Sequence, residues 1–133
     1  MMKEHGSYKI ELYEQVIIVR FISSWNRETS ENMCKEFMQI ASTITDNPWA
    51  CLIDLTQWGL GGPEVWGPIL DTNHWCAKNN QMHEAVVCSQ VIQEHILREL
   101  QTALPTTKSG FFKTEADAEI WLNSKGYKIL KEA

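Results

Sequence analysis

The chain has 133 residues, of which 44% are apolar, and its formal net charge is −5. This length and apolar content suffice for one hydrophobic core, so we expect a single domain over residues 1–133 that needs no disulfide or metal for stability. A negative chain without a basic cluster argues against nucleic acid as a partner, because phosphate binding requires clustered Lys and Arg. No apolar run approaches the roughly 20 residues of a membrane-spanning helix, so no transmembrane segment is expected.

The cysteines and the N-terminal residues indicate the cellular compartment in which we expect the protein. The first residues lack the apolar core of a signal peptide, and the four cysteines, at positions 34, 51, 76 and 88, form no Cys-x-x-Cys pair. Two of them lie in apolar strand-like runs, where cysteine behaves as a small hydrophobe. Free buried thiols in an unexported chain suit a reducing compartment, so we expect a cytoplasmic protein.

The N-terminal third predicts a β-hairpin followed by a helix. Residues 8–12 alternate apolar and polar side chains, as in a half-exposed edge strand, and residues 16–21 form an apolar run that we expect to be covered on both faces. Residues 26–44 then have helical spacing, with one apolar stripe of Met33, Phe37, Ile40, Ala41 and Ile44. The turn chemistry of residues 46–48 ends this helix.

The middle of the chain predicts a buried strand, an irregular segment and a helix. Residues 49–55 are a short continuous apolar run, typical of a central strand. Residues 56–67 contain four glycines and Pro63, and Pro68 follows directly. We therefore expect an irregular segment with a turn near Pro63. Because proline suits the first turn of a helix, the main helix is expected from about Pro68 to Asn79, with Ile69, Leu70 and Cys76 facing inward.

The C-terminal part predicts two more strands, each followed by a helix. Residues 85–88 form a buried strand, and Ser89 can cap a helix whose apolar stripe is Ile92, Ile96, Leu100 and Ala103. Residues 110–112 form a last short strand. Thr114 caps the final helix, which ends at Gly126 and buries Ala118, Trp121 and Leu122.

This order of elements predicts an α/β fold. We expect a single mixed, mostly parallel sheet of about five strands, with an antiparallel N-terminal hairpin and four helices, because strands that alternate with helices form parallel crossovers.

Two stretches carry a family resemblance. Residues 51–56 read Cys-Leu-Ile-Asp-Leu-Thr, and residues 111–122 contain a strand, a capped helix start and a Trp-Leu ending. Together with the element order, which extends the likeness over residues 8 to about 127, they resemble the STAS-like family. This is the fold of the bacterial anti-sigma-factor antagonists, and it is related to the lipid-binding CRAL-TRIO domains. The resemblance implies a regulatory domain that binds another protein.

The sequence departs from that family at one position of interest. In the antagonists, the loop after the central strand carries an Asp-Ser-Ser-Gly-like motif whose serine is phosphorylated at a helix start. The corresponding residues 59–64, Gly-Leu-Gly-Gly-Pro-Glu, contain neither Ser nor Thr. The phosphorylation switch therefore does not carry over, and Glu64 places a fixed negative charge near the position of the phosphoserine.

The same glycines raise the alternative of a phosphate-binding loop. They lack the third glycine of the Gly-x-Gly-x-x-Gly pattern, and Glu64 stands at that position and would repel phosphate. We therefore expect a tight turn that needs positive φ angles, and no cofactor.

Candidate catalytic and metal-binding groups are sparse. The histidines, at positions 5, 74, 83 and 95, lack the short fixed spacings of zinc ligands, so no metal is expected. His95 lies nearly two helical turns beyond Cys88 and Ser89, too far to activate either. Asp54 ends a strand, where open α/β sheets place their sites, and could form a carboxylate pair with Glu64. We assign no catalytic residue.

Six tryptophans are the most unusual feature of the composition. Trp49 and Trp121 fit the core, whereas Trp58, Trp66 and Trp75 cluster around the irregular segment, where they either plug the end of the sheet or contact a ligand. The leading hypothesis is a non-catalytic regulatory domain that binds a protein through residues of this region: Asp54, Trp58, Gly61, Gly62, Glu64, Trp66 and Ile69.

Two other hypotheses stay open. The first is a carrier or sensor of a small apolar, lipid-like ligand, which requires a pocket bordered by Trp58, Trp66 and Ile69. The second is a small enzyme that uses Asp54 and Glu64. The sequence leaves open whether the chain forms a homo-oligomer.

Overall fold

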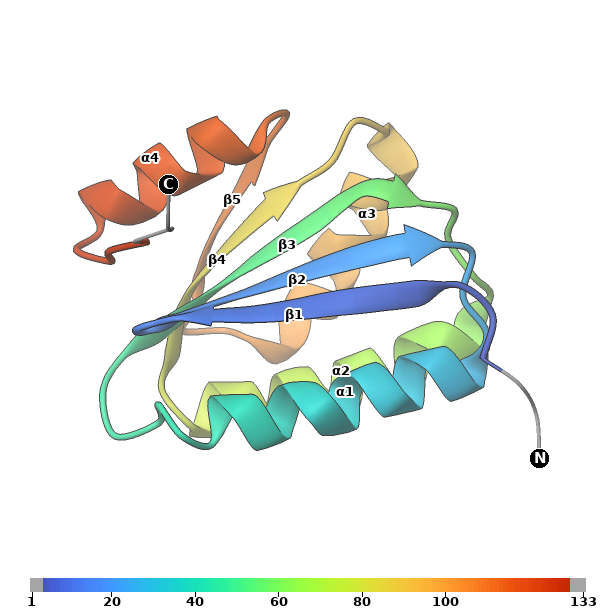
Figure 1. Ribbon diagram of the computed structural model, residues 1–133, viewed down its shortest axis with the longest axis horizontal. Coiled ribbons are helices and arrows are strands. Elements are labelled where there is room, and N and C mark those ends of the chain that lie inside the picture. Colours follow the sequence, from blue (N-terminus) through green and yellow to red (C-terminus); the bar gives the residue numbers. More distant parts are fainter. Residues whose placement is uncertain (1–3, 130–133) are drawn as a thin grey trace.

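The computed structural model describes residues 4–129, and one five-stranded sheet forms its centre (Figure 1). The sheet order follows the chain order: β1 (Ser7–Tyr13), β2 (Val16–Ser23), β3 (Trp49–Trp58), β4 (Gln81–Val87) and β5 (Lys108–Phe112). β1 and β2 form an antiparallel hairpin, and the remaining neighbours pair in parallel. The predicted mixed sheet with an antiparallel N-terminal hairpin is confirmed.

Helices cover both faces of this sheet. They are α1 (Arg27–Ala41), α2 (Pro63–Lys78), α3 (Val91–Leu100) and α4 (Glu115–Ser124), with a short 3-10 turn, η1 (Gln101–Ala103), after α3. α1, α2 and α3 share a core with one face, and α4 packs against the other face (Figure 1). None of the helices within residues 4–129 has the length and apolar character that crossing a bilayer requires.

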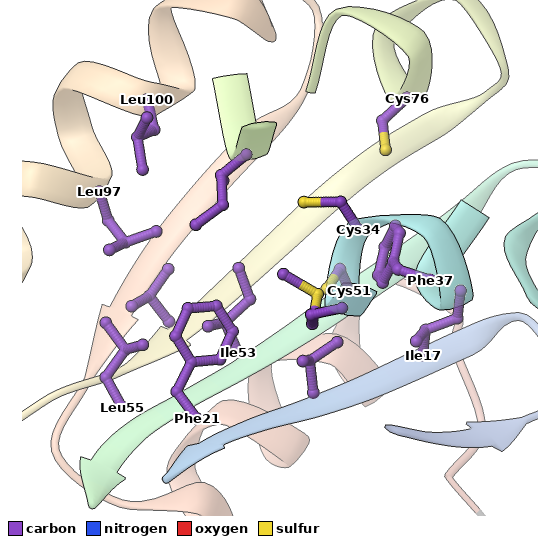
Figure 2. Packing of buried hydrophobic residues seen from close by; sticks show 14 of the residues in the cluster. Ile17, Phe21, Cys34, Phe37, Cys51, Ile53, Leu55, Cys76, Leu97 and Leu100 are labelled. Atoms are coloured by element: carbon purple, nitrogen blue, oxygen red, sulfur yellow. The ribbon is translucent and has the colours of Figure 1, made fainter. Parts of the chain in front are cut away.

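β2 and β3 are buried on both faces, as their continuous apolar runs predict. Ile17 and Val19 face α1 and α2, and Val16 and Ile18 face α4. In the larger core, Phe21 packs near Ile53 and Leu55, with three cysteine side chains farther along the same layer (Figure 2). The predicted stripe of α1 faces this core, and the side chain of Asn26 caps the helix by accepting the Thr29 N–H.

The segment between β3 and α2 is more regular than the sequence predicts. β3 continues to Trp58, and α2 begins at Pro63, so the predicted helix start at Pro68 is wrong. Pro63 occupies the first helical position, where the missing N–H removes no helical hydrogen bond. Pro68 lies within the helix and leaves the carbonyl of Glu64 without its helical donor; Glu64 is exposed, so water can reach it.

α3 is rotated relative to the predicted stripe. Its N-cap is Gln90 and not Ser89, and Ile92, predicted to face inward, is 53% exposed. The inward residues are Gln93, Ile96, Leu97 and Leu100. β4 ends opposite Asp54, so the last carbonyls of β3 lack a partner strand on that side. Gln93 Nε2 donates to two of them, on Leu55 (2.9 Å) and Trp58 (3.3 Å), and this admits a polar side chain to the interior.

Candidate functional site

The candidate site lies at the C-terminal edge of the sheet, where β2 to β5 end and the four helices begin. At this edge the glycine segment, residues 59–62, connects β3 to α2. Backbone hydrogen bonds fix the segment to the turn after β2: the Gly59 N–H donates to Ser23 O (3.0 Å), and the Trp25 N–H donates to Leu60 O (2.9 Å). The Ser24 hydroxyl donates to Gly59 O (3.0 Å). These hydrogen bonds to residues 23–25 therefore hold the glycine segment in one conformation.

The glycines of this segment are needed because neighbouring atoms lie close to the backbone, and not because their φ angles are positive. Positive φ angles occur instead at Leu60 (φ 74°) and at Ser23 (φ 62°), the last residue of β2. A Cβ placed on Gly61 would lie 2.6 Å from Val65 Cγ2 and 2.9 Å from Trp25 O. The expectation of a glycine turn with positive φ is therefore wrong. Two neighbouring non-glycine residues in the left-handed region are costly, and such strain concentrates at functional sites.

Glu64 places its carboxylate at the N-terminus of α2. The N-cap, Gly62, has no side chain to bond the first helical N–H groups, and Glu64 lies in the first turn. A Cβ on Gly62 would meet Glu64 Oε2 at 2.5 Å, so the carboxylate is folded back over the N-cap. A negative charge in this position is stabilised by the helix dipole. The residue is exposed, so the charge faces solvent.

The tryptophans of this region differ in accessibility. Trp58 is 4% exposed and packs edge-on against Phe21 (ring centroids 5.2 Å apart) and Trp25 (6.0 Å). Trp66 is half-buried and packs against the same core, and Ile69 is 7% exposed. Trp58 and Ile69 therefore support this edge from the interior, whereas part of Trp66 reaches the surface.

Asp54 lies apart from these residues, on the α4 side of the sheet. Its Oδ2 accepts from Arg20 Nη1 at 3.3 Å, and its Oδ1 accepts from the backbone N–H (2.9 Å) and hydroxyl (2.7 Å) of Thr56. Arg20 also binds the carboxylates of Glu11 and Glu115, which raise the pKa of its guanidinium despite partial burial. Asp54 is thus part of an ion-pair network and forms no carboxylate pair with Glu64.

Two residues of this edge were missed by the sequence reasoning. Trp25 stacks on Phe21, with ring centroids 4.2 Å apart, and so completes the aromatic cluster under the glycine segment. Gln93 ties α3 to the end of β3. The adjacent pair Ile96 and Leu97, followed by Leu100, could have indicated the rotation of α3 that turns Gln93 inward.

A small cavity lies between the sheet and the layer of α1 and α2. Its volume is about 30 Å³, and Phe21, Cys34, Ile69 and Glu84 are among its lining residues. Pockets that hold drug-sized ligands measure about 300–1,000 Å³. This cavity is therefore too small for a lipid-like ligand unless the core opens. Within the described part of the chain, no group of three His, Cys, Asp or Glu side chains is placed to hold a metal ion.

Comparisons with solved structures identify the fold. An uncharacterised protein of the DUF3478 family from Shewanella loihica PV-4, described as having a SpoIIAA-like fold, superimposes with a TM-score of 0.68 at 18% identity, over 92% of this chain and 97% of that one. The fold is STAS-like. The anti-sigma factor antagonist SpoIIAA in its unphosphorylated form matches this STAS-like chain with a TM-score of 0.64 at 6% identity, over 91% and 100% of the two chains.

A third STAS-like structure agrees with these two. An anti-sigma factor antagonist from Mycobacterium paratuberculosis gives a TM-score of 0.60 at 15% identity, over 90% of this chain and 95% of that one. Neither a family model nor a curated protein matches the sequence. At these identities the comparisons establish the STAS-like fold alone.

Proposed function

We propose that this protein is a non-catalytic regulatory domain that binds another protein through the C-terminal edge of its sheet. The binding surface comprises the glycine segment, Glu64 and the exposed part of Trp66. Two of the solved structures with this fold are described as anti-sigma factor antagonists, a name that implies action on a protein partner. The cysteines in the described part of the chain are free thiols, which suits the reducing cytoplasm.

The observation that carries this proposal is the carboxylate of Glu64 over the N-terminus of α2. One of those antagonists is described in its unphosphorylated form, so it also has a phosphorylated one. The family resemblance places its phosphorylated serine at the start of the corresponding helix. Residues 59–64 offer no hydroxyl here, and Glu64 supplies the negative charge. We therefore propose that this surface is permanently charged and not switched by phosphorylation.

A binding role fits the chemistry of the edge better than catalysis. Asp54 is engaged with Arg20 and Thr56, on the α4 side of the sheet. Glu64 lies at the start of α2, which packs on the other side. Asp54 and Glu64, the two carboxylates considered for catalysis, therefore lie on different sides of the sheet, and Glu64 is an exposed charge next to the hydrogen-bonded glycine segment.

Affinity capture with paired charge reversals tests the proposal. The tagged chain and its variants are immobilised, and proteins recovered from a lysate of the source organism are quantified by mass spectrometry. Glu64→Lys should reduce recovery of the same protein by at least about tenfold, as loss of an interface anchor does. Asp46→Lys makes the same charge change in the exposed turn before β3, at the opposite end of the sheet, and should leave recovery unchanged. Equal recovery by all three proteins would contradict the proposal.

A further inference from the structure

The first turn of α3 reverses the usual division between an apolar inside and a polar outside. Val91 is 84% exposed and Ile92 is 53% exposed, whereas Gln93 is only 1% exposed. Surface helices ordinarily turn branched apolar residues toward the core and leave amides in water. Places where a sequence breaks such a local rule are expected at functional sites.

Hydrogen bonds place this apolar pair at the same edge as the glycine segment. Gln93 Nε2 donates to the carbonyls of Leu55 (2.9 Å) and Trp58 (3.3 Å), the last of which directly precedes Gly59. The first turn of α3 is thereby fixed against the end of β3. Val91 and Ile92, which we call the α3 patch, project into solvent from this fixed turn.

Two buried polar atoms beneath the α3 patch have no hydrogen-bond partner among the described residues. They are Gln93 Oε1 and Trp58 Nε1, and both residues are less than 5% exposed. Buried polar atoms in folded proteins are nearly always paired, so each exception calls for an explanation. The two residues contact each other through the hydrogen bond from Gln93 Nε2 to the Trp58 carbonyl.

The charges around the α3 patch define what would bind it. Each helix starts at this edge with a carboxylate in its first turn: Glu28, Glu64, Glu94, Glu115 and Asp117. Among the cations, Arg20 is held by three carboxylates, one of which is Glu115. Arg27 is held by Glu31 and Arg98 by Glu94, while Lys113 adds one positive charge in the turn before α4. Glu94 and Glu115 are thus paired with arginines, and Glu28, Glu64 and Asp117 leave a net negative charge at the edge that carries the apolar pair.

We infer that Val91 and Ile92 are apolar anchor points of the partner-binding surface, and that the partner presents an apolar segment flanked by Lys or Arg. The apolar side chains of that segment cover the α3 patch, and its cations face the carboxylates of the helix starts. This inference rests on the proposed function and extends its surface from α2 to α3.

Selection of peptides from a displayed random library tests the inference even though the partner is unidentified. The full chain is the bait, and selected peptides are measured against it and its variants by isothermal titration calorimetry. We expect apolar sequences flanked by Lys or Arg, whose binding weakens at least about tenfold with Ile92→Asp. Ile120→Asp is the matched control, because Ile120 is also exposed (65%) but lies on α4. Binding should also weaken in high salt.

Four outcomes would overturn the inference. Selected peptides could be acidic, or their affinity could be the same for wild type, Ile92→Asp and Ile120→Asp. Light scattering could instead show a wild-type dimer that Ile92→Asp converts to a monomer, which would make the α3 patch a contact between two copies. If Glu64→Lys abolishes partner recovery while Ile92→Asp leaves it intact, the proposed function stands and this inference fails. Urea unfolding of each variant confirms that it is folded.

Discussion

Arg20 of β2 binds Glu115, the first residue of α4, at two points: Nη2 lies 2.9 Å from Oε1, and Nη1 lies 3.0 Å from Oε2. The same guanidinium contacts Glu11 and Asp54, so one cation joins the hairpin, the central strand and the helix on the α4 face. The bidentate geometry is the strong form of such a pair. This network fixes the start of α4 against the sheet.

Removing the two partners should have unequal effects. Glu115→Gln removes one carboxylate and leaves Arg20 paired with Glu11 and Asp54, so we expect a loss of about 1 kcal/mol in the free energy of unfolding. Arg20→Met leaves three neighbouring carboxylates without a cation and should cost about 2–3 kcal/mol. Urea unfolding followed by tryptophan fluorescence measures both. A larger loss for Glu115→Gln than for Arg20→Met would contradict this interpretation.

Two glycine-to-alanine substitutions should change the free energy of unfolding in opposite directions. In Gly61→Ala the new methyl group would overlap Val65 and the carbonyl of Trp25, so we expect a loss of about 1–3 kcal/mol. Gly67 lies inside α2, and a Cβ there meets no atom within 4 Å. Gly67→Ala should therefore stabilise by about 0.5–1 kcal/mol through helix propensity. Thermal unfolding compares the two, and a destabilising Gly67→Ala or a neutral Gly61→Ala would count against the described packing.

The buried carboxyl group of Glu84 should make stability depend on pH. Burial raises its pKa from 4.5 to about 7, and the hydrogen bond from Gln101 Nε2 (2.7 Å) opposes this rise. Because the folded state holds the proton more tightly, its stabilising contribution is complete below about pH 4.5 and is lost as the pH rises through 7. The full difference is on the order of 3 kcal/mol.

Glu84→Gln isolates this effect in urea titrations between pH 5 and pH 8. The wild type should lose more of its free energy of unfolding over this range than the variant does. Burial lowers the pKa of His83, whose contribution changes in the opposite direction and is common to both proteins. Parallel curves for the two proteins would refute the assignment to Glu84.

The cysteine thiols of the core should be unreactive in the folded protein. Burial raises the pKa of Cys34 to about 11 and raises the pKa values of Cys51 and Cys76 as well. Their side chains lie in the layer between β3 and the helices α1 and α2 (Figure 2). Since the thiolate is the reactive form, dithionitrobenzoate should label these thiols only on unfolding. Rapid labelling of Cys34 in native protein would show that this layer opens readily.

The fold could be predicted because its elements are locally encoded. The β-branched, apolar run of residues 16–21 favours a strand buried on both faces, and the stripe of α1 has a single helical period. The start of α2 could not be chosen from sequence, because Pro63 and Pro68 both suit a helix start. In the folded protein Gly62 is the N-cap, so the helix starts at Pro63.

The site was harder to predict because its contacts connect distant residues. Gln93 is buried because β4 ends early and leaves carbonyls of β3 unpaired; the apolar residues of α3 can indicate its rotation but not these partners of Gln93. The partner of Asp54 is Arg20, a cation inside an apolar run. The left-handed residue of the glycine segment is Leu60, although its glycine neighbours are better suited to that conformation. The sequence did predict that the glycine segment lies between a strand and a helix, and it connects β3 to α2.

Amide hydrogen exchange of the chain, alone and with the protein that it captures, tests the proposed binding surface most directly. Binding through the C-terminal edge predicts new protection in residues 59–66 and in the first turn of α3, with α4 and the turn of residues 42–48 unchanged. Protection confined to α4 or to the opposite end of the sheet, with residues 59–66 exchanging as in the free chain, would contradict it.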